Sequence, residues 1–212
     1  YCHKVNVDKM NFVEIQKLPG PFYNYKSKDI LYKNEIDITP TYTPQPPEVS
    51  EYFEEIGVIV NTIIPDEIFL KPDSQVMLTM NLSVEDGLVN GSRGVITKCE
   101  KEGVYVKFCN REQDLFIGYN DFEYTDPDTK ISFVRMHIPL QLSWSMSVHR
   151  SQGQTIDYAK LDIGKNIFCA GQAYVALSRM SSLEGTILMS FDAKKVYASD
   201  EALDFDEMIK NK

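Results

Sequence analysis

The clearest hydrophobic pattern in the chain is a strict alternation over residues 140–148. Apolar side chains occupy every second position, and the positions between them are polar, most of them serine. A period of two is typical of a β-strand with one buried face. Small polar side chains on the other face would let a helix pack closely against it. We therefore expect a strand here, followed by a turn over residues 149–153.

The sequence after this turn alternates between strand-like and helix-like segments. It predicts a strand over 159–163, a helix over about 171–180 and a strand over 186–191. Strand, helix and strand in succession favour parallel strands joined by right-handed crossovers. From residue 139 onward the fold class is therefore predicted as α/β.

Residues from about 70 to 132 have a different pattern, in which short apolar runs alternate with turn residues. Turns are expected at Asn90-Gly91, Glu102-Gly103 and Asn110-Arg111. Several short strands within about 60 residues suggest a small barrel of the SH3 type. The expected strands cover residues 75–80, 94–99, 104–109 and 114–118.

The first 70 residues predict two short helices and an extended connector between them. The helical pattern over 11–18 is closed by the stop Leu18-Pro19-Gly20-Pro21. A second helix is expected over about 49–60. The connector, residues 39–47, carries four prolines and has little chance of regular structure.

Composition narrows the classes of protein that fit. The 212 residues carry a net charge of −9, with acidic side chains gathered in 48–55, 121–128 and 200–207. This balance counts against a broad surface that coats DNA, but it leaves room for a narrow track of hydrogen-bonding groups. No apolar run is long enough to span a bilayer, so we expect no membrane contact.

The four cysteines do not form the clustered pairs that a structural zinc site needs. Cys99 and Cys109 would face each other across a hairpin, which leaves a disulfide as one alternative. Reduced thiols in an intracellular protein are the default that we favour.

Two clusters carry candidate chemistry. The first runs from Ser147 to Thr155, where a glycine and several hydrogen-bond donors follow the alternating strand. Loops at the carboxyl ends of strands are where α/β sheets collect ligands. The second ends in Arg179, near the end of the predicted helix, where a guanidinium can stabilise charge on a transferring phosphate. The alternatives are an ordinary polar turn and a solvated arginine at a helix end.

Several segments, taken in order, resemble superfamily 1B DNA helicases of the petite-integration-frequency family, with RecD-like enzymes as relatives. The segments over 139–153 and 174–179 are similar to motifs V and VI of these enzymes. Further matching segments are Leu18-Pro19-Gly20, residues 25–29, residues 70–81 and residues 87–94. The resemblance covers nearly the whole chain.

The resemblance implies the C-terminal part of a helicase motor: a RecA-like (P-loop NTPase-type) domain 2A with an inserted SH3-like β-barrel, domain 2B. The implied boundaries place the first part of domain 2A at 1–71, domain 2B at 72–132, and the second part of domain 2A at 133–212. Motifs V and VI lie in the last of these.

The resemblance also implies the roles of individual residues. Arg179 is the expected catalytic arginine that reaches the γ-phosphate of ATP, and Gln152 and Gly153 are expected beside the nucleotide. Contacts with single-stranded DNA are expected from Asn81, Ser147, His149, Arg150 and Ser151. Arg150 stands where the family usually carries lysine, which keeps the charge but changes the donor geometry.

The sequence lacks a G-x-x-x-x-G-K-[ST] phosphate loop and an acidic magnesium site. The resemblance therefore implies that ATP and Mg²⁺ are held with an upstream RecA-like domain of the same protein, and that this segment alone is not an ATPase. It further implies 5′-to-3′ movement on single-stranded DNA, unwinding in replication, repair or recombination, and primase or other replication proteins as partners.

Two further expectations concern origin and role. Departures from the family pattern, together with a composition rich in Lys, Asn and Tyr, suggest a divergent replicative helicase of a large DNA virus. We expect an intracellular protein of the nucleus or the cytoplasm, at a cytoplasmic replication site if it is viral. The alternative function is a helicase-derived docking module for nucleic acid or protein that has lost catalysis. A phosphate loop encoded upstream would favour the motor over this alternative.

Overall fold

The computed structural model describes residues 1–33, 36–39, 47–127 and 129–210. The chain divides into two compact units. Unit 1 consists of residues 1–17 and 142–212, and unit 2 of residues 18–141. The fold class is mixed α/β, as the sequence predicts.

Unit 1 is built on two parallel strands, β12 and β13, in register from Ala159 opposite Thr186 to Ile163 opposite Phe191. Both strands have the predicted bounds, and their pairing confirms that they are parallel. The helix α3 between them is shorter than predicted. The elements of this unit are α1 (Lys4–Lys17), η1 (His149–Ser151), β12 (Ala159–Ile163), α3 (Gln172–Leu177), β13 (Thr186–Phe191), η2 (Ala193–Lys195) and α4 (Asp200–Lys210).

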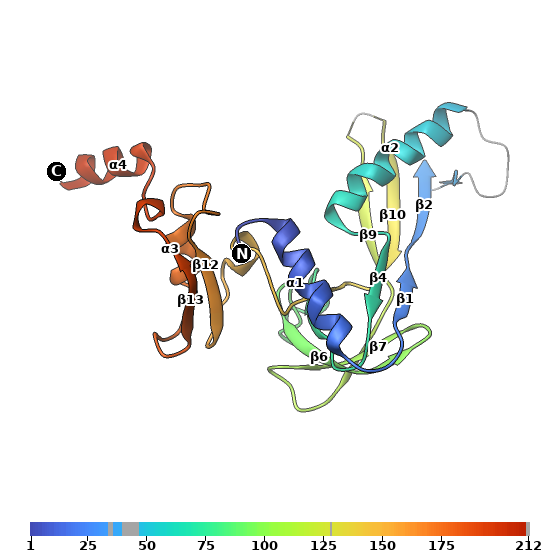
Figure 1. Ribbon diagram of the computed structural model, residues 1–212. Coiled ribbons are helices and arrows are strands. Elements are labelled where there is room, and N and C mark those ends of the chain that lie inside the picture. The colour runs from blue at the N-terminus through green and yellow to red at the C-terminus, as the bar shows by residue number, and fades with distance from the viewer. Residues whose placement is uncertain (34–35, 40–46, 128, 211–212) are drawn as a thin grey trace. The chain divides into compact units, whose positions relative to one another are not determined.

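The described residues of unit 2 form three sheets and one long helix (Figure 1). Its elements are β1 (Tyr23–Lys26), β2 (Lys28–Lys33), β3 (Ile36–Asp37), α2 (Pro47–Ile63), β4 (Glu67–Leu70), β5 (Gln75–Leu78), β6 (Arg93–Glu100), β7 (Gly103–Phe108), β8 (Leu115–Gly118), β9 (Asn120–Thr125) and β10 (Ile131–His137). A further strand, β11 (Leu140–Leu142), reaches the boundary between the units.

The predicted small β-domain corresponds to the sheet with strand order β11-β5-β6-β7-β8. Each of its four predicted strands is present, with ends that shift by one or two residues. Buried apolar residues of β6 and β7, such as Ile96, Val104 and Val106, form its interior. The pairings of β5 with β6, β6 with β7 and β7 with β8 are antiparallel. The two-residue connection between β6 and β7 requires this arrangement.

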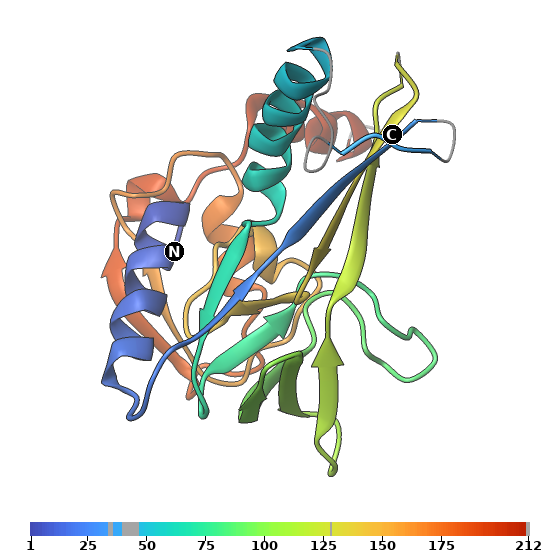
Figure 2. The same ribbon diagram turned by 90° about the vertical axis from the view of Figure 1, so that its right-hand side faces the viewer.

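A second sheet of unit 2, with order β3-β2-β10-β9, was not predicted. The helix α2 packs on it through Ile56 and Val60, against Leu31, Ile131 and Phe133. Figure 2 shows this sheet from a second direction. It joins strands from both sides of the expected boundary at residue 71, and the implied domain boundaries stay predictions. Most of the proline-rich connector lies outside the described residues.

The strand predicted over 140–148 was wrong in its extent, because only Leu140–Leu142 is β-structure. Ser143 and Ser145 are buried. The side chain of Asn11, on α1, supplies bonds that a neighbouring strand would otherwise make. Its Nδ2 donates to the carbonyl oxygens of Leu142 (3.3 Å) and Ser145 (3.0 Å), and its Oδ1 accepts from the Ser145 N–H (2.8 Å). The expected close approach of a helix to the small residues is confirmed.

Candidate functional site

The loop that follows residue 146 folds into one hydrogen-bonded turn. The N–H of Ser151 donates to the carbonyl oxygens of Ser147 and Val148, each at 3.2 Å. The Ser151 hydroxyl is buried and donates to the Val148 carbonyl oxygen at 2.7 Å. In this arrangement Ser151 stabilises the turn, and its direct contact with DNA stays a prediction.

The same turn presents His149, Arg150, Gln152 and Gly153 to solvent. Gly153 has a φ of +77°, and nothing lies within 4 Å of the position that a Cβ would take. Glycine is therefore favoured at this position by the left-handed backbone and not by crowding. Four of the predicted site residues thus share one exposed surface of unit 1.

Arg179 lies two residues beyond the end of α3 and is half-buried. Its Nε donates to the Val175 carbonyl oxygen at 3.3 Å, and its Nη2 donates to the Ser178 hydroxyl at 3.1 Å. A guanidinium has five N–H donors, so these two bonds leave donors for an anion. The side chain is therefore held in one orientation and still able to bind phosphate oxygens.

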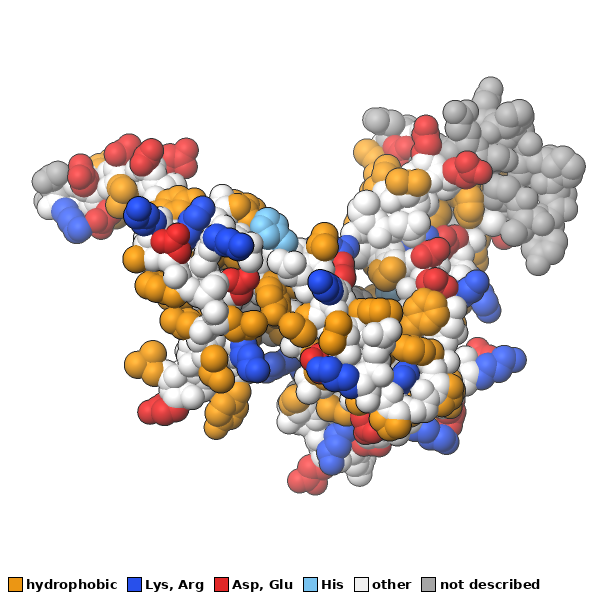
Figure 3. Space-filling model, viewed as in Figure 1, with side chains coloured by type: hydrophobic (Ala, Val, Ile, Leu, Met, Phe, Trp, Pro, Cys, Tyr) orange, Lys and Arg blue, Asp and Glu red, His pale blue; other side chains and the backbone are white. Residues whose placement is uncertain are grey.

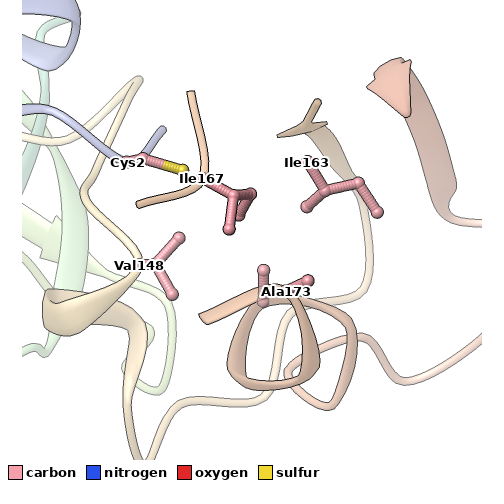
Figure 4. Close-up of a cluster of buried hydrophobic side chains, with 6 residues drawn as sticks. Cys2, Val148, Ile163, Ile167 and Ala173 are labelled. Carbon is pink, nitrogen blue, oxygen red and sulfur yellow. The ribbon is translucent and has the colours of Figure 1, made fainter. Parts of the chain in front are cut away.

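A backbone hydrogen bond joins Arg179 to the segment that follows the Gly153 loop. The N–H of Ile156 donates to the Arg179 carbonyl oxygen at 2.9 Å. Figure 4 shows a second connection, a buried hydrophobic cluster. In it Val148, at the start of the turn, packs with Ile163 of β12, with Ile167 and with Ala173 of α3. The predicted nucleotide-binding residues therefore stand on one connected framework within unit 1.

Asn81 belongs to unit 2 and lies in the loop after β5, because that strand ends at Leu78 and not at the predicted residue 80. Its Oδ1 accepts from the N–H of Asn90 at 2.8 Å, which fixes the orientation of the exposed amide. The loop is braced further by Arg111, whose Nη2 donates to the Asp86 carbonyl oxygen at 2.7 Å. The Asn81 amide nitrogen is thus presented on a braced loop as a neutral donor.

A pocket of unit 1 was missed by the sequence reasoning. It lies where β12 and β13 end, and none of the predicted site residues lines it. The carboxylate of Asp162 accepts hydrogen bonds there from the Ser190 hydroxyl and from Asn166 Nδ2. Burial raises the pKa of Asp162, but the bonds from Ser190, Asn166 and the Gly164 backbone outweigh it and hold the pKa below its ordinary value. No sequence motif marks this group.

Charge is divided unequally between the units. Unit 1 holds 11 basic and 11 acidic residues, whereas unit 2 holds 11 basic and 20 acidic ones. In Figure 3, basic side chains lie among acidic and hydrophobic ones, and acidic side chains gather along α4. The net charge of −9 therefore resides in unit 2, and the predicted loop and Arg179 lie in the neutral unit.

The described residues hold neither a cluster of metal ligands nor a helix that could span a membrane. No group of three or more His, Cys, Asp or Glu side chains there is placed to hold a metal ion. Within the same residues, no helix is both long enough and apolar enough to cross a membrane. The cysteines are all free thiols, and Cys99 is buried whereas Cys109 is exposed.

The sequence is similar to known helicases over most of its length. Residues 56–99 match the family described as DNA helicase Pif1, 2B domain. The chain is 34% identical over 208 residues to the human ATP-dependent DNA helicase PIF1, covering 96% of this chain and 28% of that protein. It is 33% identical over 213 residues to the Xenopus laevis protein of the same name, covering 96% of this chain and 29% of that protein. The chain thus spans under a third of these relatives.

Solved structures give the same result. The Pif1 helicase of Candida albicans superposes with a TM-score of 0.76 at 27% identity, over 99% of this chain and 48% of that one. The Bacteroides Pif1 helicase in complex with ADP-AlF3 and ssDNA superposes with a TM-score of 0.65 at 25% identity, over 100% of this chain and 44% of that one. The predicted fold, a RecA-like helicase fragment with a 2B domain, is confirmed.

Proposed function

The chain is a Pif1-like region of a superfamily 1B helicase, corresponding to its C-terminal part, and from this premise we propose that it is one half of an ATP-dependent DNA motor. The motor would move 5′ to 3′ on single-stranded DNA and unwind duplex DNA. The other half would be a RecA-like domain upstream in the full-length protein. ATP would bind between the two, and closure around ATP would move them relative to each other along the strand.

The observation that carries this proposal is the state of Arg179. Two of its five N–H donors hold the side chain against its own helix, at 3.3 and 3.1 Å. The remaining donors can approach the γ-phosphate of ATP without breaking those bonds. An arginine so placed stabilises the charge that develops on the transferred phosphoryl group.

The other predicted site residues fit two roles. Gln152 and Gly153 would lie beside the nucleotide, where the left-handed backbone of Gly153 sets the course of the loop. Ser147, His149 and Arg150 would contact the DNA strand directly, and Ser151 would do so or hold the turn that presents them. Asn81 would donate to the DNA backbone from its own unit.

Mg²⁺ would be held outside this segment. We assign the magnesium ligands and the phosphate loop to the upstream domain, because this sequence contains no G-x-x-x-x-G-K-[ST] motif. Replication proteins such as primase, and the viral origin suggested by composition, stay predictions.

The test compares full-length wild-type protein with Arg179→Ala in hydrolysis of ATP stimulated by single-stranded DNA. We expect a loss of two or more orders of magnitude with nucleotide binding intact, since removing such an arginine commonly costs about 10³–10⁵-fold. Arg150→Ala is the matched control. It removes an exposed arginine of the same unit and is expected to weaken DNA binding while leaving kcat at saturating DNA within about threefold.

Two outcomes would count against the proposal. Unchanged hydrolysis by Arg179→Ala would remove that residue from the nucleotide site. A full-length wild-type protein without any DNA-stimulated hydrolysis would favour the docking module that has lost catalysis.

A further inference from the structure

A short segment after Gly153 is fastened to the residues around Arg179. Ile156 donates its N–H to the Arg179 carbonyl oxygen at 2.9 Å, and its own carbonyl oxygen accepts from the Ser181 N–H at 3.0 Å. The two bonds form an isolated parallel bridge between Ile156 and Met180. The Ile156 side chain is 8% exposed, so the bridge is anchored in the interior.

Contacts on the far side of the bridge keep the two segments together. The hydroxyl of Ser181 donates to Asp157 Oδ1 at 2.8 Å, and the Ala159 N–H donates to the Gly185 carbonyl oxygen at 2.9 Å. Gly185 packs directly on Asp157, because an added Cβ would lie 1.6 Å from the Asp157 carbonyl oxygen. Any side chain at 185 would push the segments apart.

Backbone bonds also lead from Ile156 back into the exposed loop. The N–H of Gln154 donates to the Ser151 carbonyl oxygen at 3.1 Å, and the Ser151 N–H donates to the Ser147 carbonyl oxygen at 3.2 Å. Only Thr155 separates Gln154 from Ile156. Two hydrogen bonds within residues 147–154, the covalent backbone through Thr155 and the bridge at Ile156 therefore connect Ser147 to Arg179.

We propose that Ile156 and Asp157 form a coupling segment that transmits occupancy of the loop by DNA to the position of Arg179. This inference rests on the proposed function and adds how its two sites communicate. A loop displaced by a bound strand must move Ile156, and the bridge then moves the backbone of Arg179. Asp157 acts through Ser181 and is a positioning residue, not a catalytic one.

The coupling segment can be loosened from either side in the full-length protein. Gly185→Ala forces the junction open, and Asp157→Ala removes the acceptor for Ser181. Asp157→Asn keeps an oxygen that accepts from Ser181, so it should restore what Asp157→Ala loses. The control for the first change is Gly57→Ala in unit 2, where nothing lies within 4 Å of the added Cβ.

The kinetic result expected is a separation of kcat from the binding constants. For Gly185→Ala, kcat of DNA-stimulated hydrolysis should fall about 10- to 100-fold, the size expected when a catalytic group is displaced by about 1 Å. KM for ATP and Kd for an oligo-dT strand should stay within about twofold. Asp157→Ala should lower kcat by about threefold, because its bond with Ser181 is exposed.

Amide hydrogen exchange gives a readout that needs no hydrolysis. In wild type, oligo-dT should slow exchange in peptides covering 147–154 and in peptides covering 179–183. In Gly185→Ala the slowing should remain in the first set and disappear from the second. A purely structural role for the junction would change exchange in both sets with or without DNA.

The outcomes separate this inference from the proposed function. Slowing confined to 147–154 in wild type, or a kcat for Gly185→Ala equal to that of wild type, overturns the coupling and leaves the motor intact. If Gly185→Ala does not fold, the Asp157 pair decides, and equal kcat for Asp157→Ala and Asp157→Asn overturns the coupling. Absence of DNA-stimulated hydrolysis in wild type overturns the motor instead.

Discussion

Arg135 in unit 2 and Arg179 in unit 1 are held in opposite ways. The Arg135 side chain is 1% exposed and pairs with both carboxylate oxygens of Asp29 at 2.8 and 2.6 Å. It also donates to Asn61 at 2.6 Å and to the Ile64 carbonyl oxygen at 2.7 Å. The Arg179 side chain donates only to Val175 and Ser178, at its own helix end, and Arg179 stays half-buried.

The difference separates a structural arginine from one that can act on a ligand. Arg135 joins β2, β10 and the end of α2, and four of its five donors are occupied by protein. Arg179 uses only two of its five N–H donors in bonds to protein, which leaves three for a ligand. The units therefore use the same side chain once to hold the fold together and once, as we propose, to hold phosphate.

The largest effect on stability should come from Arg135→Ala. Removing one partner of a buried ion pair leaves the other charge without compensation, which commonly costs about 3–5 kcal/mol. We expect a value near the lower end, because the side chain of Asp29 is 20% exposed. The free energy of unfolding from urea titration measures it.

Arg179→Ala is the counterpart in unit 1, and it should change the free energy of unfolding by about 0.5 kcal/mol or less. Equal losses of stability for the two variants would break the comparison. That result would mean that Arg179 is a structural residue as well.

The next largest effect should follow Asn11→Ala in unit 1. The amide of Asn11 makes three hydrogen bonds to the backbone of Leu142 and Ser145, and Asn11 is 6% exposed. Leaving such buried groups unpaired costs about 1–3 kcal/mol, which thermal unfolding would register. Gln16→Ala, at an exposed position of the same helix, is the control and should be nearly neutral. A loss below about 0.5 kcal/mol for Asn11→Ala would show that water replaces these bonds.

Asn11 also explains why the pattern over 140–148 misled the sequence prediction. An alternating segment forms a strand when the backbone of a neighbouring strand bonds to its N–H and carbonyl groups. Here the side chain of Asn11 on α1, more than 130 residues away in sequence, bonds to those groups instead. No local pattern contains that information. By contrast, β12 and β13 have their predicted bounds, because short apolar runs between turn residues define them locally.

Distance in sequence limited the other predictions in the same way. The ion pair of Arg135 joins residues 106 positions apart, and the bond from Ser190 to Asp162 joins residues 28 apart. Strands β9 and β10 carry half-buried or polar residues on one face, so their sheet was missed. The loop and Arg179 were predicted as site residues because motif resemblance, and not periodicity, marked them.

A smaller effect is expected from Asp162→Asn in the pocket of unit 1. Hydrogen bonds keep the pKa of Asp162 below its ordinary value of 3.8 in the folded protein. Its stabilising contribution is therefore fully present above that value and is lost as the pH falls through the lower folded pKa. We expect Asp162→Asn to cost about 1 kcal/mol at pH 7, and the difference from wild type to shrink below about pH 4. A difference that stays constant down to pH 2 would assign the loss to packing.

The smallest expected effect concerns how the affinity for DNA varies with salt, and it tests the contrast in charge between the neutral unit 1 and the acidic unit 2. We propose that Arg150 contacts a phosphate with a full charge, whereas Asn81 donates as a neutral amide. Arg150→Ala should therefore reduce the slope of log affinity against log salt by about 1, so that its loss of affinity is about fourfold larger at 50 mM than at 200 mM salt.

Asn81→Ala should lower affinity for oligo-dT by a factor that does not vary with salt, because no counterion is released at a neutral donor. Fluorescence anisotropy of the full-length protein at several salt concentrations measures both. If Asn81→Ala changed the slope as much as Arg150→Ala does, the charged contact would not be confined to unit 1, and local charge would not explain how 212 residues with a net charge of −9 could make the proposed contacts with DNA.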